Sequence, residues 1–314
     1  MLVGTAVAAI SMPGGGWFTN GGWFNSAPNS GVIFASPSGP VGAMFRGIII
    51  WRALAAMVVA LFIQIGTNFA NDYSDGVKGT DNETRVGPIR LVGSGLKSPS
   101  AVKKAAFASF GVAALAGLAL AAATTWWLLL VGAVCFAAGW LYTGGPKPYG
   151  YYGFGELFVF VFFGLVATVG STYVQTEWQI WRGLPWVVWP CAVAVGCLAT
   201  ALLVTNNLRD IPTDTVAGKK TLAVRIGDQP TRILYVVLMV IPFVLLPFIA
   251  GLAHRPWAVL AFAAIFVAQK PILIVLQGTK GPGLIAVLAG TGRVQLVYGL
   301  LLSIGLFLSA APLH

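Results

Sequence analysis

Charge is scarce in this sequence. Only 9% of its 314 residues are charged, whereas 57% are hydrophobic and the mean hydropathy is +0.83. So little charge excludes a soluble globular domain, whose composition includes far more of it. The net charge of +10 does not indicate nucleic-acid binding, because Lys and Arg at the ends of apolar segments orient a membrane protein. The composition therefore indicates a polytopic membrane protein.

Cysteine and histidine are also rare. Cys135, Cys191 and Cys197 all lie in apolar segments and form no CxxC motif. Packing as small hydrophobic side chains is therefore favoured over metal binding or disulfide formation. The two histidines, His254 and His314, lie outside the charged clusters, so no histidine is expected in the chemistry.

Apolar segments dominate the chain, and we interpret residues 1–314 as one all-α transmembrane domain with nine helices. The helices are expected near residues 1–12, 46–70, 105–123, 126–142, 154–173, 185–205, 233–252, 257–276 and 293–311. The first segment has no cationic start, so no cleavable signal peptide is expected. As a helix it would span only about 18 Å of the roughly 30 Å hydrocarbon core, which suggests a truncated first helix.

The connections between these segments differ in charge. Residues 13–44 carry none and are expected to form a non-cytoplasmic loop, with tryptophan and phenylalanine side chains at the membrane interface. The opposite face includes the connections 71–104 and 206–232. All but four of the 19 Lys and Arg residues lie on or next to it, the exceptions being Arg46, Arg52, Arg182 and Arg255. By the positive-inside rule this face is cytoplasmic.

Two acidic clusters follow apolar segments on the predicted cytoplasmic face. Asp72 and Asp75 follow the second segment, and Asp210 and Asp214 follow the sixth. If the second cluster is helical, its i, i+4 spacing places both carboxylates on one face, where they can share a hard divalent cation. We interpret the four residues as ligands of two magnesium ions that bind a diphosphate between the clusters.

Amide, cationic and phenolic side chains accompany both clusters. The candidate substrate-binding residues are Asn68, Asn71, Lys78, Arg85, Tyr142, Lys147, Asn206, Asn207, Arg209, Lys219 and Arg225. Amide oxygens can ligate the metal or orient the carboxylates, and the cations can bind outer phosphate oxygens. The competing interpretation is that these are ordinary interfacial charges. Two clusters of the same design on one face favour a functional site.

Four stretches carry a resemblance to a known family. They are NDYSDGVKGTD at 71–81 with RVGP at 85–88, WLYTGGPKP at 140–148, residues 155–156 with 160–164, and NNLRD at 206–210 continuing through 225–227. They resemble the UbiA superfamily of intramembrane aromatic prenyltransferases, and within it the 1,4-dihydroxy-2-naphthoate polyprenyltransferases of menaquinone synthesis. The resemblance covers almost the whole chain beyond Ala43. The loop at 142–146 and the extended second acidic motif make the narrower match specific.

The resemblance implies a nine-helix bundle with a central cavity under a cytoplasmic cap, in the plasma membrane of a bacterium. It implies that the four Asp residues of the clusters hold magnesium while an allylic polyprenyl diphosphate ionises. The prenyl cation would be attacked by 1,4-dihydroxy-2-naphthoate, and loss of carbon dioxide would give demethylmenaquinol. Where the superfamily has a further Asp this chain has Gly79, and Asp81 is the expected substitute ligand.

Other functions stay open at this point. A related prenyltransferase could use 4-hydroxybenzoate, homogentisate or a tetrapyrrole as the acceptor, although those relatives usually lack the pattern at 142–145. A CDP-alcohol phosphotransferase also uses membrane Asp clusters, but its later Asp pairs are absent. A cation-coupled transporter would place acidic residues near the membrane midplane, whereas here they follow the ends of apolar segments.

Overall fold

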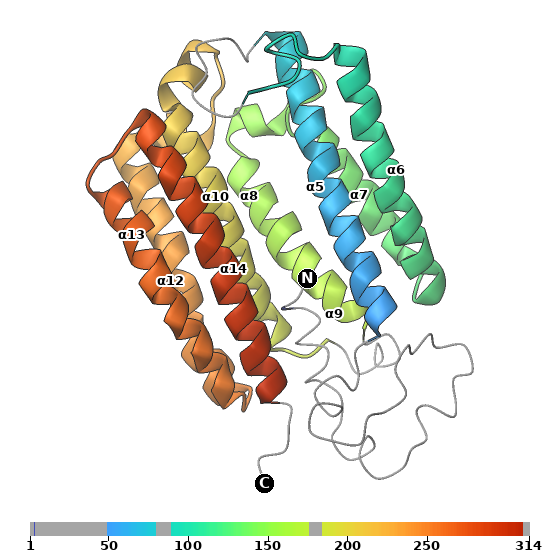
Figure 1. Ribbon diagram of the computed structural model, residues 1–314, viewed down its shortest axis with the longest axis vertical. Helices are drawn as coiled ribbons and strands as arrows, with labels where there is room; N and C mark the ends of the chain where they lie inside the picture. Colours follow the sequence, from blue (N-terminus) through green and yellow to red (C-terminus); the bar gives the residue numbers. More distant parts are fainter. Residues whose placement is uncertain (1–2, 4–48, 80–88, 176–183, 310–314) are drawn as a thin grey trace.

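The computed structural model describes residue 3 and residues 49–79, 89–175 and 184–309. In this part of the chain every regular element is a helix, as the sequence predicts, and consecutive long helices run antiparallel (Figure 1). Seven are long and apolar enough to cross a membrane, and α7 is a shorter apolar helix. The bounds are α5 Ile50–Lys78, α6 Pro99–Ala123, α7 Trp127–Leu141, α8 Gly155–Val159, α9 Ala167–Tyr173, α10 Val188–Val216, α11 Leu222–Ile226, α12 Asp228–Leu252, α13 Ile265–Leu276 and α14 Leu284–Leu308.

Two composite segments complete the bundle. A π-helical turn, Phe160–Val166, joins α8 to α9 in one continuous segment that we call the α8–α9 rod. A 3₁₀ helix, Pro256–Ala264, leads directly into α13. Of the predicted first helix at 1–12 only residue 3 is described, and the predicted loop at 13–44 lies outside the described residues.

Five helices extend beyond their predicted bounds. α5 continues through the first acidic cluster to Lys78 and ends at Gly79, whose φ of +69° suits a glycine. α10 continues through the second cluster to Val216, so the connections at 71–104 and 206–232 are partly helical rather than loops. In α5 and α10 polar residues were expected to end the helix, but several of their side chains face a polar cavity and the backbone stays helical.

Three helices extend beyond their predicted bounds at their starts. α6 begins at Pro99 instead of Ala105, and α12 begins at Asp228 instead of Ile233. α14 begins at Leu284 instead of Arg293. In α14 glycines were expected to end the helix, but a helix tolerates single glycines at a cost of about 1 kcal/mol each.

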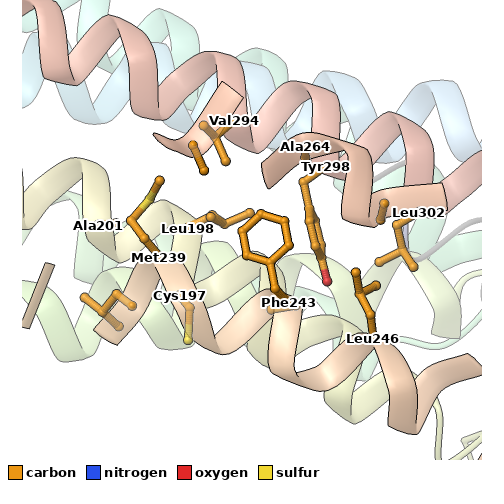
Figure 2. Packing of buried hydrophobic residues seen from close by; sticks show 14 of the residues in the cluster. Cys197, Leu198, Ala201, Met239, Phe243, Leu246, Ala264, Val294, Tyr298 and Leu302 are labelled. Carbon is orange, nitrogen blue, oxygen red and sulfur yellow. The ribbon is translucent and has the colours of Figure 1, made fainter. Parts of the chain in front are cut away.

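In the described part of the chain, the larger of two clusters of buried hydrophobic residues lies among α10, α12, α13 and α14. Tyr235, Met239 and Leu246 of α12 are completely buried there. The rings of Phe243 and Tyr298 meet edge to face (Figure 2), and their centroids are 5.6 Å apart. No residue described in α5, α6 or α7 belongs to this cluster. The part of the bundle formed by α10, α12, α13 and α14 is therefore filled by buried side chains, whereas the part around α5, α6 and α7 leaves room for cavities.

Glycine allows the α8–α9 rod to approach α10 closely. A Cβ atom added to Gly164 would lie 2.4 Å from Cα of Gly196 and 2.9 Å from its backbone nitrogen. Backbone atoms cannot rotate away as a side chain can, so only glycine fits this contact. The approach places Glu156, in the first turn of α8, beside Asn207 of α10.

A buried arginine joins helix ends at the end of the bundle where α5 begins. Arg52 donates from Nη1 to the carbonyl oxygen of Val174 (3.1 Å) and from Nη2 to that of Ala123 (3.0 Å). The side chain of Gln175 exchanges two hydrogen bonds with the backbone of Ile49. These bonds satisfy carbonyls at the ends of α6 and α9 that have no partner within their own helices.

A second buried arginine, Arg232, lies at the opposite end. It forms a two-pronged ion pair with Asp228, with N–O distances of 2.6 and 2.9 Å. It also donates to the carbonyl oxygens of Val275 (2.7 Å) and Thr279 (2.9 Å). The start of α12 is thereby joined to the end of α13.

Replacing Arg232 with Met is expected to lower the free energy of unfolding by about 2–3 kcal/mol, because two carbonyls and one carboxylate lose their donor. Thermal unfolding of the purified protein in detergent measures this change. Lys104→Met is the matched control, since Lys104 is exposed on α6 and its removal should change stability by less than about 0.5 kcal/mol. Equal melting temperatures for the two variants would contradict the assigned role of Arg232.

Candidate active site

The ends of α5 and α10 enclose a polar cavity of about 530 Å³, which we call the polar chamber. Asp75, Asp210 and Asp214 line it, together with Lys78 and Lys219. Both helices end on the same side of the bundle, at the top in Figure 1. The fold therefore brings together three of the four carboxylates that the sequence predicts as metal ligands.

A second cavity of about 910 Å³ lies deeper in the bundle, and we call it the apolar cavity. Its lining is mostly apolar and includes the aromatic side chains Phe158 and Phe162 of the α8–α9 rod. Asn71, Tyr142 and Asn206 line both cavities, so they form the junction between them. The combined space suits a ligand with a charged head and an apolar tail.

Helical spacing decides which polar residues of α5 face these cavities. Asn68, Asn71, Asp75 and Lys78 follow one another at intervals of three, four and three residues, which is one face of a helix. Asn68 lines the apolar cavity, whereas Asp75 and Lys78 line the polar chamber. The Asn71 Oδ1 atom accepts a hydrogen bond of 2.9 Å from the hydroxyl of Thr143. Along this stripe α5 thus changes from amide side chains beside the apolar cavity to charged side chains in the polar chamber.

Asp72 does not line the polar chamber. It is buried, and its two carboxylate oxygens accept hydrogen bonds from the backbone N–H groups of Leu91 (2.9 Å) and Val92 (3.0 Å). Asp72 directly follows Asn71 along α5, which turns it about 100° from Asn71 around the helix axis. In the structure Asp72 holds the loop that precedes α6, and it is not grouped with the three chamber carboxylates.

Asp75 is held by a phenol and an ammonium group. The hydroxyl of Tyr151 donates to Oδ1, and Nζ of Lys219 lies 3.3 Å from Oδ2. The same ammonium lies 4.7 Å from the centre of the Tyr151 ring, and that of Lys78 lies 5.2 Å from it. Tyr151 is absent from the predicted site residues, because its position in a short 3₁₀ helix, Tyr149–Tyr152, has no periodic spacing relative to Asp75.

Asp210 forms a buried ion pair with its neighbour. Nε and Nη2 of Arg209 each lie 2.6 Å from one carboxylate oxygen of Asp210, and Nη2 also donates to Oδ1 of Asn206 (2.8 Å). Arg209 is only 4% exposed and does not line the polar chamber. The structure therefore places this predicted phosphate-binding residue behind Asp210.

The other predicted cations differ in position. The ammonium of Lys78 donates hydrogen bonds of 2.6 and 3.1 Å to two carbonyls of the loop after α7. Lys147 is exposed and lines neither cavity. Arg225 is also exposed, and its Nε donates to a backbone carbonyl (3.1 Å). Asp81 and Arg85 lie outside the described residues.

Glu156 is a further buried acid beside the site that the sequence analysis did not select. Its Oε1 accepts a hydrogen bond of 2.9 Å from Nδ2 of Asn207, which lines the polar chamber. Tyr142 packs against Gly155, where an added Cβ would lie 3.3 Å from the phenol oxygen. Burial raises the pKa of Tyr142 well above its usual value, and the charge of Glu156 raises it further. The phenol at the junction is therefore neutral.

The donor atoms of the polar chamber suit magnesium. They are carboxylate and amide oxygens, which hard divalent cations prefer. In the part of the chain that the structure describes, no three Asp, Glu, His or Cys side chains form a group that could hold a metal ion unaided. This arrangement fits magnesium, which usually completes its shell with water and substrate phosphates.

Comparisons with known proteins agree with this architecture. The model of the UbiA prenyltransferase family matches residues 30–282. A 1,4-dihydroxy-2-naphthoate octaprenyltransferase from Mycobacterium tuberculosis is 51% identical over 82% of this chain and 86% of its own length. The Escherichia coli protein of the same name is 36% identical over 82% of this chain and 84% of its own.

A solved structure is also similar. It is that of a UbiA homolog from Archaeoglobus fulgidus bound to DMAPP and Mg²⁺, with a TM-score of 0.52 and 16% sequence identity, covering 98% of this chain and 94% of that one. At this identity the likeness concerns the fold. Together with the extent of the family match, it leads to one conclusion: the chain belongs to the UbiA prenyltransferase family.

Proposed function

We propose that this protein transfers a polyprenyl group from an allylic polyprenyl diphosphate to 1,4-dihydroxy-2-naphthoate, with loss of carbon dioxide, to form demethylmenaquinol in menaquinone synthesis. The observation that carries the proposal is the junction of the polar chamber with the apolar cavity at Asn71, Tyr142 and Asn206. A polyprenyl diphosphate has the same two parts, a charged head and a long apolar tail. Relatives at 51% and 36% identity bear the name of this reaction, which supports the choice of acceptor.

Asp75, Asp210 and Asp214 are the residues that would hold magnesium, for which we propose two ions. When bound, magnesium neutralises the diphosphate and makes it a better leaving group. Arg209 fixes the orientation of the Asp210 carboxylate, and Tyr151 fixes that of Asp75. The ammonium of Lys219 lies in the same chamber and can bind outer phosphate oxygens.

The reaction breaks the allylic C–O bond, and its electron pair leaves with the diphosphate. The ring carbon that bears the carboxylate then bonds to the prenyl carbon, and the electrons of the lost C–CO₂ bond restore the aromatic ring. The protein has to keep water away from the cation. Tyr149, Phe158 and Phe162 line the apolar cavity and offer ring faces that stabilise positive charge.

We also propose that the polar chamber faces the cytoplasm of a bacterium, with the helices in its plasma membrane. The long helices alternate in direction, so the connections after α5, α7, α10 and α13 lie at one end of the bundle (Figure 1). Most of the Lys and Arg residues belong to these connections or their margins. Cytoplasmic connections carry such an excess of Lys and Arg.

Incorporation of radiolabelled polyprenyl diphosphate into lipid-extractable product tests the function. The purified protein is assayed with 1,4-dihydroxy-2-naphthoate or 4-hydroxybenzoate, with magnesium or with EDTA. The expected result is product with the naphthoate and magnesium alone. Product with 4-hydroxybenzoate instead would keep the reaction class and change the acceptor. If folded protein makes no product with any acceptor, the enzyme proposal is rejected and ion transport becomes the alternative to measure.

Lys219 and Lys147 form a pair that tests the location of the diphosphate. Lys219→Met is expected to raise KM for the polyprenyl diphosphate about tenfold, because a charge-assisted hydrogen bond is lost in the polar chamber. Lys147→Met should leave that KM within about twofold, since Lys147 is exposed and lines neither cavity. A larger effect at Lys147 would move the diphosphate out of the chamber.

A further inference from the structure

The amide group of Asn207 has a defined orientation. Its Nδ2 donates to Oε1 of Glu156 across the contact between α8 and α10, at 2.9 Å. Its Oδ1 has no hydrogen-bond partner among the described residues, yet it is not one of their buried unsatisfied atoms. Because Asn207 lines the polar chamber, this exposed oxygen faces the chamber and the NH₂ group faces Glu156.

Glu156 is a costly partner for this amide. It is 6% exposed, and its second oxygen, Oε2, is buried without a hydrogen-bond partner among the described residues. A glutamine could accept the same bond from Asn207 and would bury no carboxylate. A glutamine could also donate through its NH₂ group, however, and would then allow the opposite amide orientation, whereas in the structure Oε1 of Glu156 accepts from Asn207. Glutamate at position 156 is therefore harder to bury than glutamine, but it fixes Asn207 as the donor of the hydrogen bond between them.

We propose that Glu156 is a positioning residue that presents the carbonyl oxygen of Asn207 to the polar chamber, where it accepts a hydrogen bond from a hydroxyl group of the aromatic acceptor. This inference rests on the proposed function. Of the two substrates only the aromatic one carries O–H donors, since an ionised diphosphate offers acceptors. Asn207 also adjoins Asn206, which lines the junction where the ring has to meet the prenyl carbon.

Glu156→Gln is the direct test. The variant allows the Asn207 amide to turn its NH₂ group into the chamber, so KM for 1,4-dihydroxy-2-naphthoate is expected to rise about tenfold. KM for the polyprenyl diphosphate should change less than about twofold, because that substrate does not use the oxygen. The melting temperature should change little, because glutamine keeps the shape of the side chain and one hydrogen bond to Asn207, and its second polar atom takes the place of Oε2, which has no partner among the described residues.

A double variant, Glu156→Gln with Asn207→Asp, tests the direction of the bond. The new carboxylate can only accept from the glutamine NH₂, so an oxygen faces the chamber again and KM for the acceptor should recover to within about threefold of the wild-type value. Thr200→Val is the matched control. It removes a hydroxyl oxygen of α10 that is buried without a partner among the described residues and lines neither cavity, and both KM values should stay unchanged.

The possible failures are distinguishable. If the wild-type protein makes no product, the proposed function is rejected. The role of Glu156 is then still tested by fluorescence titration, which compares the affinity of the wild type and of Glu156→Gln for the naphthoate. An unchanged acceptor KM and affinity in Glu156→Gln would overturn it. A shift in the magnesium concentration for half-maximal activity, with the acceptor KM unchanged, would also overturn it, because the O–H donor would then be metal-bound water.

Discussion

Asp75→Asn is expected to lower kcat by about 10²–10³-fold, with little change in melting temperature. The substitution keeps the shape of the side chain and one acceptor for the hydroxyl of Tyr151. It removes one of three carboxylates from the polar chamber, and with it a negative ligand for magnesium. Steady-state turnover at saturating magnesium and both substrates measures the loss.

Asp72→Asn separates the two members of the first acidic cluster. Because Asp72 holds the backbone of Leu91 and Val92 instead of lining the chamber, its loss of kcat should stay below about tenfold. Limited proteolysis in the loop before α6 should become faster in this variant only. Equal losses of kcat in both variants, with equal proteolysis, would return Asp72 to the metal site.

Gly164→Ala is expected to lower the free energy of unfolding by about 3 kcal/mol, near the upper end of what overpacking usually costs. The new methyl group would lie 2.4 Å from Cα of Gly196, so the α8–α9 rod has to move away from α10. This movement also separates Glu156 from Asn207. Thermal unfolding in detergent measures the loss of stability.

Gly170→Ala is the control on the same rod. An added Cβ at Gly170 meets no atom within 4 Å, so its melting temperature should be unchanged or slightly raised by the better helix propensity of alanine. A normal melting temperature for Gly164→Ala as well would show that the two helices separate without cost. The pair isolates the effect of the close approach from that of losing a glycine.

The helical bundle was largely predictable from the sequence, because long apolar segments have few other solutions in a membrane. Seven of the predicted segments appear as helices long enough to cross a membrane or as parts of them, and the segment near 126–142 appears as the shorter α7. The predicted first segment lies outside the described residues except for residue 3, so the total of nine stays a prediction. Where the helices end was harder to predict. Polar residues usually indicate a loop, so both helices were predicted to end too early. In α5 and α10 several of these polar side chains instead face a polar cavity while the backbone stays helical.

The site was only partly predictable. Spacing along one helix is visible in the sequence and groups Asn68, Asn71, Asp75 and Lys78, but it does not exclude Asp72, which stands four residues after Asn68 and three before Asp75. Contacts between distant segments leave no such signal. Tyr151 comes from the short 3₁₀ helix Tyr149–Tyr152 and Glu156 from the start of α8, and each meets its partner only through the packing of the bundle. Three of the four predicted carboxylates line the polar chamber. The side chains that hold Asp75 and Asp210 in place, such as Tyr151 and Arg209, are visible as their partners only in the structure.

The ion pairs of Asp75 with Lys219 and of Asp210 with Arg209 have a consequence for the whole catalytic cycle. Each of these carboxylates already has an internal counterion before any ligand arrives. When a metal diphosphate enters, the chamber exchanges one set of counterions for another, and the ammonium of Lys219 can pass from Asp75 to a phosphate. The local charge therefore stays nearly balanced on loading and on release. A site balanced in both states need not hold its diphosphate product tightly, which favours repeated turnover.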